Sequence, residues 1–454
     1  MDTKTDTKLS LKPIPRDECY EDFVAAQLNA GGYYLERNVV LRDKTEVLEL
    51  DIVSNKFYEA DVDKSLIEVK SGGWGFPEIF KVKGWMDFLG LPKASFIVQK
   101  ENGSMDKYRE VSDQLNVSLI VTPEHEGKLD ESEICKVYDI KKHEKNGEIV
   151  ASLRFAFALE RRMIKVLHDT AKSVHDKKGY AVLKDYLFEI NSNSFFIADS
   201  KARAQSIFNA YADHKNITAK IDHERNGENY DDISDDVSIT YDTFRHLFYE
   251  CDASSILYSS LYVEWLQRMS MLKCCVEEIQ KPIESKLFDF TKLPDKLEER
   301  MKELESHTYY YLYPYFWQVF IFLFGGFILN DKKDDEYQLL SEITNIPVEE
   351  IPNAFSALDT LFPFGDDKKW LYDIQNASMS VLQLFPIPLC GIGANFRRLI
   401  YAKDKVYPDL KNVLTGKYTY ENLIKWNQLG YKMLQKSNDI EQVIANNESD
   451  KKTP

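Results

Sequence analysis

The sequence is poor in the residues that build disulfide frameworks and zinc sites. The chain of 454 residues has six cysteines, and none of them forms a CxxC motif or a disulfide-like spacing. Its eight histidines form neither an HExxH motif nor a cluster with cysteine, so a zinc site has no support. No secretory signal opens the chain either, and we therefore expect it in a reducing cytoplasm.

The sequence also lacks a hydrophobic run long enough to span a bilayer. The most apolar stretch, YFWQVFIFLFGGFIL, covers residues 315–329. A membrane-spanning helix needs roughly 20 apolar residues. Gln318 and the pair Gly325–Gly326 weaken the run further. We therefore expect a buried helix at this place and no membrane partner.

Positive residues are also fewer than negative ones, with 58 lysines and arginines against 74 aspartates and glutamates. The formal net charge is −16, which argues against binding of polyanions by the whole surface. One window differs: between Lys64 and Lys100 there are six lysines against Glu68, Glu78 and Asp87. A local basic groove thus stays possible. With 44% hydrophobic and 29% charged residues, the chain has the composition of a folded protein, and its length favours two or three domains.

Hydrophobic periodicity predicts an α/β domain over residues 17–125. Helical and strand patterns alternate in the order α-β-β-β-α-β-α-β, and strands that are joined through a helix imply parallel pairing. The sheet should therefore be mixed, with helices on its flanks. The expected helices cover 17–30, 76–89 and 104–116, and the expected strands cover 33–41, 47–53, 65–70, 94–99 and 117–123.

The remaining residues indicate a second, mostly α-helical domain. Its segments are long and helix-patterned, and an acidic, turn-rich stretch marks a possible subdomain boundary at 223–238. The other expected parts are a disordered leader (1–16), a charged linker (126–150), the helical domain itself (151–435) and a polar tail (436–454).

Charged residues lie within two of the expected strands. In VLELDIV, Glu49 and Asp51 point to one side, and in SLIEVK, Glu68 and Lys70 share a side. If the two strands are neighbours, Asp51, Glu68 and Lys70 converge on one face. Two carboxylates held close together repel each other unless a cation lies between them, and Mg²⁺ prefers such oxygen ligands. A lysine beside the metal could orient a water molecule or stabilise charge on a phosphate.

A further acidic residue belongs to this pattern. Glu21 lies beside the apolar stripe of the first helix, one turn from Val24, so it can point into the domain.

The order of Glu21, Asp51 and Glu68-Val69-Lys70, followed by an amphipathic helix and a buried strand, resembles the PD-(D/E)XK nuclease superfamily. Within the superfamily the sequence looks like Mrr-type restriction endonucleases and archaeal Holliday-junction resolvases, and the resemblance covers residues 17–122. The resemblance implies a restriction-endonuclease-like fold, a phosphodiesterase that depends on Mg²⁺, with Mn²⁺ as a substitute, and DNA as the substrate. A role in prokaryotic defence or restriction would fit.

The resemblance also implies roles for individual residues. Asp51, Glu68 and the Val69 carbonyl would bind the metal, Lys70 would serve the attacking water, and Glu21 would bind a second metal or a water. The sequence departs from the family pattern because Leu50 stands where the proline of the motif is expected. Since Glu49 and Asp51 share a face, either of them could be the metal ligand.

Residues that follow the lysine could contact nucleic acid. Trp74, in SGGWGFPE, could stack on a base or plug the edge of the core. Lys81 and Lys83 could contact phosphates or simply face solvent. Residues 339–362 have the rhythm of a helix-turn-helix, but the second helix is acidic, which disfavours DNA reading. CGIGANF (390–396) lacks the third glycine of a nucleotide-binding loop.

Two other functions remain open from the sequence. The first domain could be an inactive nuclease fold that binds nucleic acid or supports assembly. Alternatively, the acidic helical half could make the chain a protein-interaction protein, with a protein partner or a second copy bound through the C-terminal domain.

Overall fold

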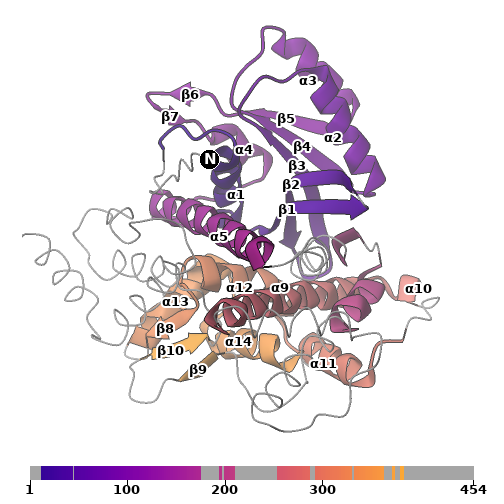
Figure 1. Ribbon diagram of the computed structural model, residues 1–454, viewed down its shortest axis with the longest axis vertical. Coiled ribbons are helices and arrows are strands. Elements are labelled where there is room, and N and C mark those ends of the chain that lie inside the picture. The colour runs from indigo at the N-terminus through magenta and orange to yellow at the C-terminus, as the bar shows by residue number, and fades with distance from the viewer. Residues whose placement is uncertain are drawn as a thin grey trace, which may run out of the picture.

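An N-terminal α/β unit packs on a layer of helices, and one long helix runs between them (Figure 1). The computed structural model describes residues 12–43, 45–174, 194–196, 199–209, 253–286, 292–329, 332–361, 371–373 and 379–382. Within these stretches no helix is both long and apolar enough to cross a membrane.

The N-terminal unit has a five-stranded mixed sheet in the order β1-β2-β3-β4-β5. The first three strands pair antiparallel, and β3, β4 and β5 pair parallel through the crossover helices. Both the expected element order and the mixed sheet are confirmed. The strands are β1 (Tyr34–Asp43), β2 (Thr45–Phe57), β3 (Val62–Lys70), β4 (Lys93–Val98) and β5 (Val117–Val121).

Helices cover the sheet on both faces. Successive residues of its inner strands point to opposite sides, and both sides carry apolar residues that become buried under helices. In β3, Leu66 packs with the residues of α2, whereas Ile67 packs with those of α1. Phe96 and Ile97 of β4 divide in the same way. Figure 1 shows α2 and α3 on one side and α1 on the other. The helices are α1 (Glu18–Ala30), α2 (Phe76–Phe88) and α3 (Met105–Gln114).

The segment expected as a linker, 126–150, is folded onto the first domain. It contains the second strand of a short hairpin and the helix that follows. The hairpin is formed by β6 (Glu124–His125) and β7 (Lys128–Leu129), and the helix is α4 (Ser132–Val137). Ile134 is fully buried, and the Tyr138 hydroxyl donates to Ser95 Oγ over 2.7 Å. The end of the expected leader is also held, since the Pro15 carbonyl accepts a hydrogen bond from Gln99. The sequence did not show this structure, because the few apolar residues that become buried here are separated by charged ones.

The C-terminal half is mostly helical where it is described, with one small sheet in the order β8-β10-β9. The expected boundary at 223–238, the CGIGANF loop and the polar tail lie outside the described residues. Two helices, α13 and α14, overlap the segment 339–362, and α13 begins before it, at Lys333. The helices and strands are α5 (Asn146–Val174), α9 (Ala253–Gln280), α10 (Ile283–Lys286), α11 (Asp295–Glu305), α12 (Tyr313–Phe322), α13 (Lys333–Thr344), α14 (Ile351–Thr360), β8 (Phe327–Leu329), β9 (Leu371–Asp373) and β10 (Met379–Leu382).

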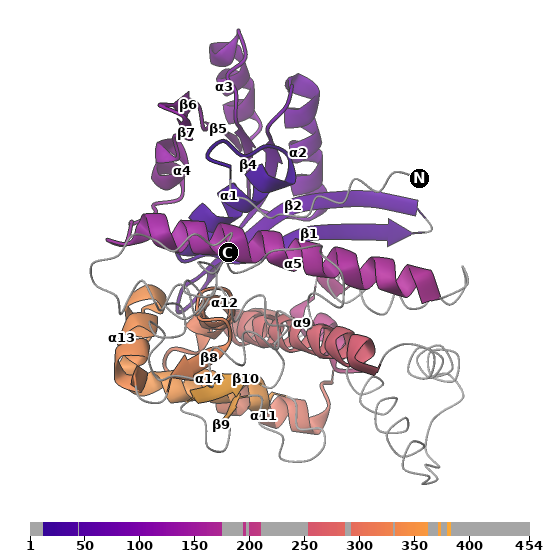
Figure 2. The same cartoon turned by 60° about the vertical axis from the view of Figure 1, so that its left-hand side comes forward.

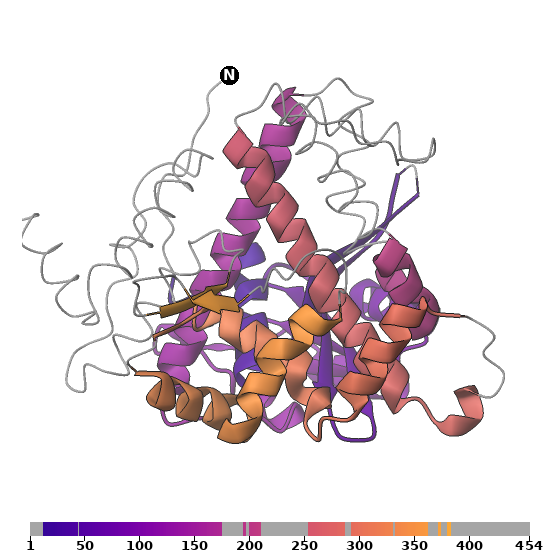
Figure 3. The same ribbon diagram turned by 90° about the horizontal axis from the view of Figure 1, so that it is seen from below.

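The long helix between the two halves is α5, which contacts both α1 and α12. Figure 2 shows α5 passing between the sheet and the helical layer, and Figure 3 shows α9 crossing below it. A single hydrophobic core extends across the interface between the halves, from Ile67 of β3 to Phe316 of α12. Ion pairs such as Lys64–Glu277 cross the same interface.

The apolar run at 315–329 is confirmed as a buried helix, α12, followed by β8. Gln318 is the polar residue of α12 that joins it to the sheet. Its Oε1 accepts from the Leu35 N–H over 3.0 Å, and its Nε2 donates to the Leu35 carbonyl over 2.7 Å. Asn29 at the end of α1 also donates to Gln318. The side-chain amide thus satisfies the outward main-chain groups of the edge strand β1.

We predict that Gln318→Leu lowers the free energy of unfolding by about 2–4 kcal/mol, because a buried N–H and a buried carbonyl lose their partners. Leucine retains much of the side-chain volume, so packing alone should change little. Chemical denaturation of both proteins measures the difference.

Gln338→Leu is the matched control, since Gln338 is exposed on α13 and only pairs with Glu342. It should change the free energy of unfolding by less than about 0.5 kcal/mol. Equal losses in the two variants would contradict the role given to Gln318.

Candidate active site

Strands β2 and β3 separate at the charged residues that the sequence singled out. Their antiparallel pairing runs from Phe57↔Val62 to Ile52↔Ile67 and then stops. The next pair in this register is Asp51 opposite Glu68. In its place the Val69 N–H donates to Asp51 Oδ2 over 2.8 Å. We call this point the strand fork. The two strands are neighbours, as expected, and they bring the two carboxylates together.

The backbone on the other side of Asp51 is irregular as well. Asn38 of β1 has φ of 52° and is left out of the ladder between Arg37↔Ile52 and Val39↔Leu50. In this register Asn38 stands opposite Asp51, so the pair that would hold Asp51 to β1 is missing. The ladder is thus interrupted on both sides of Asp51, which lines an open space at the fork.

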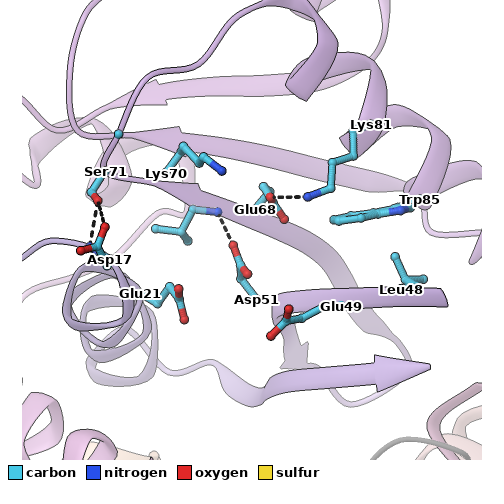
Figure 4. Close-up of a pocket in the computed structure, with 12 residues that line it drawn as sticks. Asp17, Glu21, Leu48, Glu49, Asp51, Glu68, Lys70, Ser71, Lys81 and Trp85 are labelled. Carbon is cyan, nitrogen blue, oxygen red and sulfur yellow. Dashed lines mark hydrogen bonds and ion pairs between the residues drawn. The ribbon is translucent and has the colours of Figure 1, made fainter. Parts of the chain in front are cut away.

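A pocket of about 510 Å³ occupies this space (Figure 4). Its walls come from α1, β2, β3 and α2, so it takes residues from the helices of both layers. Five carboxylates line it against two ammonium groups, and the apolar ring of Trp85 closes one end. The lining residues are Asp17, Glu21, Leu48, Glu49, Asp51, Glu68, Val69, Lys70, Ser71, Gly72, Lys81 and Trp85.

Asp51 holds its proton unusually strongly. Burial, followed by repulsion from Glu68 and Glu21, raises the pKa of Asp51 to about 8. The hydrogen bond from Val69 and the charge of Lys81 oppose this shift without cancelling it. In the absence of a cation, Asp51 is therefore largely protonated at neutral pH.

Glu68 is buried and only half satisfied. Its Oε1 accepts from Lys81 Nζ over 2.9 Å, whereas its Oε2 is buried without a hydrogen-bond partner among the described residues. Burial raises the pKa of Glu68, and the ion pair with Lys81 counteracts it. The same Lys81 ammonium lies 3.9 Å from the centre of the Trp85 ring, a cation–π contact.

Lys70 follows Glu68 on the same strand and lines the pocket (Figure 4). Its positive charge lowers the pKa of Glu68. Within the described part of the chain it forms no ion pair, so its ammonium group is available to an incoming ligand.

Glu21 reaches the pocket from α1, and its charge contributes to the high pKa of Asp51. Burial raises the pKa of Glu21 itself. Arg161 of α5 donates to Glu21 over 3.3 Å and to Asp22 over 2.8 Å. A residue of the helical half thus fixes the carboxylate that the sequence assigned to a second metal or a water.

The structure does not place Trp74 or Lys83 in the pocket. Trp74 is only 9% exposed; its N–H donates to the Lys100 carbonyl, and its ring packs on Phe96 and Tyr108. Trp74 thus fills the edge of the core and does not face the pocket, where it could have stacked on a base. Lys83 pairs with Asp87 on the outer side of α2.

Lys81 does line the pocket, but it binds a carboxylate there. More generally, four of the six lysines in the basic window are paired with acidic residues, so the basic groove is largely neutralised. The four pairs are Lys64–Glu277, Lys81–Glu68, Lys83–Asp87 and Lys93–Asp63.

Sequence reasoning missed several residues of the site. The Asp17 N–H donates to Ser71 Oγ over 2.8 Å, and the Ser71 hydroxyl donates back to Asp17, which brings Asp17 to the pocket at a φ of 52°. Trp85 could have been found, since it lies one helical turn beyond Lys81. No local signal connects Arg161 with Glu21, because the two are far apart in sequence.

The residues at the fork suit a Mg²⁺ ion. No cluster of three or more His, Cys, Asp or Glu side chains with metal-binding geometry exists in the described ranges. Mg²⁺, however, commonly uses one or two carboxylates and keeps several water ligands. Asp51 and Glu68 supply two, and Glu68 Oε2 is a buried acceptor that lacks a donor. Burial, followed by repulsion from Glu68 and Glu21, raises the pKa of Asp51, and a cation bound between the carboxylates would counteract both.

Comparisons with protein-family models, with curated proteins and with solved structures found no match for this chain.

We predict that the metal-free protein loses stability as the pH rises from about 4 to about 8. The unfolded chain releases the Asp51 proton near pH 3.8, whereas the folded protein keeps it to about pH 8. Because the folded state binds the extra proton in this range, the free energy of unfolding falls with rising pH. Asp51→Asn should remove the effect and be more stable than the wild type by on the order of 1–3 kcal/mol at pH 8 in EDTA.

Denaturation in EDTA at pH 5 and pH 8 measures this difference. The advantage of the asparagine variant should shrink at pH 5, where Asp51 is neutral in the folded wild type. An advantage of the same size at both pH values would contradict the assignment.

Proposed function

We propose that this protein is a metal-dependent nuclease of the PD-(D/E)XK type that hydrolyses phosphodiester bonds. The observation that carries the proposal is the strand fork: Asp51 and Glu68 stand opposite each other where β2 and β3 separate, and Lys70 follows on the same strand. An exposed Glu–Lys pair on a strand would explain neither the burial of Glu68 beside the partly buried Asp51 nor the pocket in front of them.

Each residue of the fork has a distinct task in this proposal. Asp51 and Glu68 would hold Mg²⁺, and the Val69 carbonyl is the proposed further ligand. The bound ion would supply an activated water and neutralise charge on the phosphate. Lys70, which has no counter-ion of its own in the described structure, would orient that water or stabilise the charge that develops on phosphorus-bound oxygens. Glu21 would bind water or a second cation from its place beside Arg161.

DNA is the proposed substrate, on the basis of the family resemblance, and a defence role would follow from it. Hydrolysis would leave a 5′-phosphate and a 3′-hydroxyl. Because four of the six lysines between Lys64 and Lys100 are paired with acidic residues, substrate affinity should depend strongly on the bound cation. Long-range attraction by the protein surface should contribute little.

We predict that the wild type cleaves plasmid DNA in Mg²⁺ or Mn²⁺ and not in EDTA. Asp51→Asn and Glu68→Gln should lose about 10²–10⁴-fold in rate, and Lys70→Ala about 10²-fold or more, because each removes a charged group at the reacting phosphate. Gel assays of initial rates, with RNA tested in parallel, measure the effects and the substrate preference.

The control is Lys93→Ala. Lys93 is exposed at the start of β4, where it pairs with Asp63 outside the pocket, and the variant should cleave at the wild-type rate. Full activity in both Asp51→Asn and Lys70→Ala would exclude the proposed site.

A further inference from the structure

The Lys81–Glu68 ion pair occupies the place where the proposed site needs a cation. Lys81 is not part of the Glu68-Val69-Lys70 strand motif; it comes from the second turn of α2. It nevertheless makes the direct contact, 2.9 Å from Nζ to Glu68 Oε1. Lys70 affects Glu68 only through its charge.

The two partners differ greatly in their exposure. The Glu68 side chain is 6% exposed, whereas that of Lys81 is 43% exposed. The carboxylate is thus fixed in the floor of the pocket, and the ammonium group reaches it from solvent along a flexible stem. Lys81 can therefore swing out into solvent, but its departure leaves the buried Glu68 charge uncompensated unless another cation takes its place.

A second contact gives Lys81 a defined position within the pocket. Its ammonium group rests over the Trp85 ring at 3.9 Å from the ring centre. Trp85 lies one turn further along α2 and lines the same pocket, so the lysine stays between the ring and Glu68. Figure 4 shows this arrangement above the fork.

We infer that Lys81 is a displaceable counter-ion: it neutralises Glu68 in the metal-free protein and competes with the divalent cation for that carboxylate. Loading of the metal then releases the ammonium group beside Trp85, where it can meet an incoming phosphate. Lys81 is thus a positioning residue that links metal binding to substrate binding. This inference rests on the proposed metal-dependent function.

The test is the affinity for Mn²⁺ itself, measured by electron paramagnetic resonance without nucleic acid. Other carboxylates of this acidic chain can also bind Mn²⁺, so only the binding that is lost in Glu68→Gln is assigned to this site. Lys81→Met removes the charge and keeps an apolar stem on Trp85. It should bind Mn²⁺ about 3- to 10-fold more tightly than the wild type, because the competing ion pair is gone. Lys81→Gln provides a second variant should the methionine variant fold poorly.

Two matched lysines separate the ion pair from a simple effect of charge. Lys70→Met removes a positive charge from the same pocket but breaks no ion pair, so it should tighten Mn²⁺ binding less. Lys83→Met changes a lysine of the same helix outside the pocket and should leave Mn²⁺ affinity unchanged.

Unchanged or weaker Mn²⁺ binding in Lys81→Met, or equal tightening in Lys70→Met, would overturn the inference. Absence of Mn²⁺ binding in every variant would overturn both this inference and the proposed function. Tighter Mn²⁺ binding in Lys81→Met without any cleavage by the wild type would support the counter-ion and reject only the nuclease.

Discussion

The repulsion between a buried carboxylate, Glu68, and a partly buried one, Asp51, is the constraint on which the site depends. Asp51 and Glu68 face each other at the strand fork, where burial penalises both charges. Without a metal, the chain offsets this cost with a proton on Asp51, a main-chain N–H from Val69 and the ammonium group of Lys81. If the site binds a divalent cation as proposed, these separate groups together take its place in the metal-free protein. Such an arrangement is costly to retain in a domain whose only task is to be stable, and it therefore favours function over scaffolding.

The helical half contributes to the same site through charge. Arg161 of α5 binds Glu21 and Asp22, and Arg37 joins Asp22 to Glu160 of the same helix. These pairs fix the rotation of α1 and hence the direction of Glu21. Removal of one partner from a buried pair leaves an uncompensated charge, so the geometry of the wall is strongly specified. The first helix of the C-terminal half is thus part of the framework of the pocket.

The sequence predicted the first domain well because its signals are local. Alternation of side chains placed Asp51, Glu68 and Lys70 on one face, and the register confirms that the two strands are neighbours. Prediction failed where the decisive partner lies on another element. Nothing near Lys81 in the sequence shows that it reaches Glu68, and nothing near Trp74 shows that Lys100 and Tyr108 enclose it. The folded structure of residues 126–150 was not predicted for a related reason. Ile134 and Tyr138 are isolated among charges in the sequence, and they become core residues only because they pack on the sheet.

The charge of the pocket constrains the order of events in the proposed reaction. Five carboxylates stand against two ammonium groups, and one of the two is already bound to Glu68. A phosphate that enters the metal-free pocket would meet net negative charge at short range, where little water screens it. A divalent cation would offset the charge of Asp51 and Glu68 at the fork, and it would add a free ammonium group to the pocket if it also released Lys81. The overall acidity of the chain is then no obstacle to a polyanionic substrate, because the attraction arises within the pocket and only after the metal has bound.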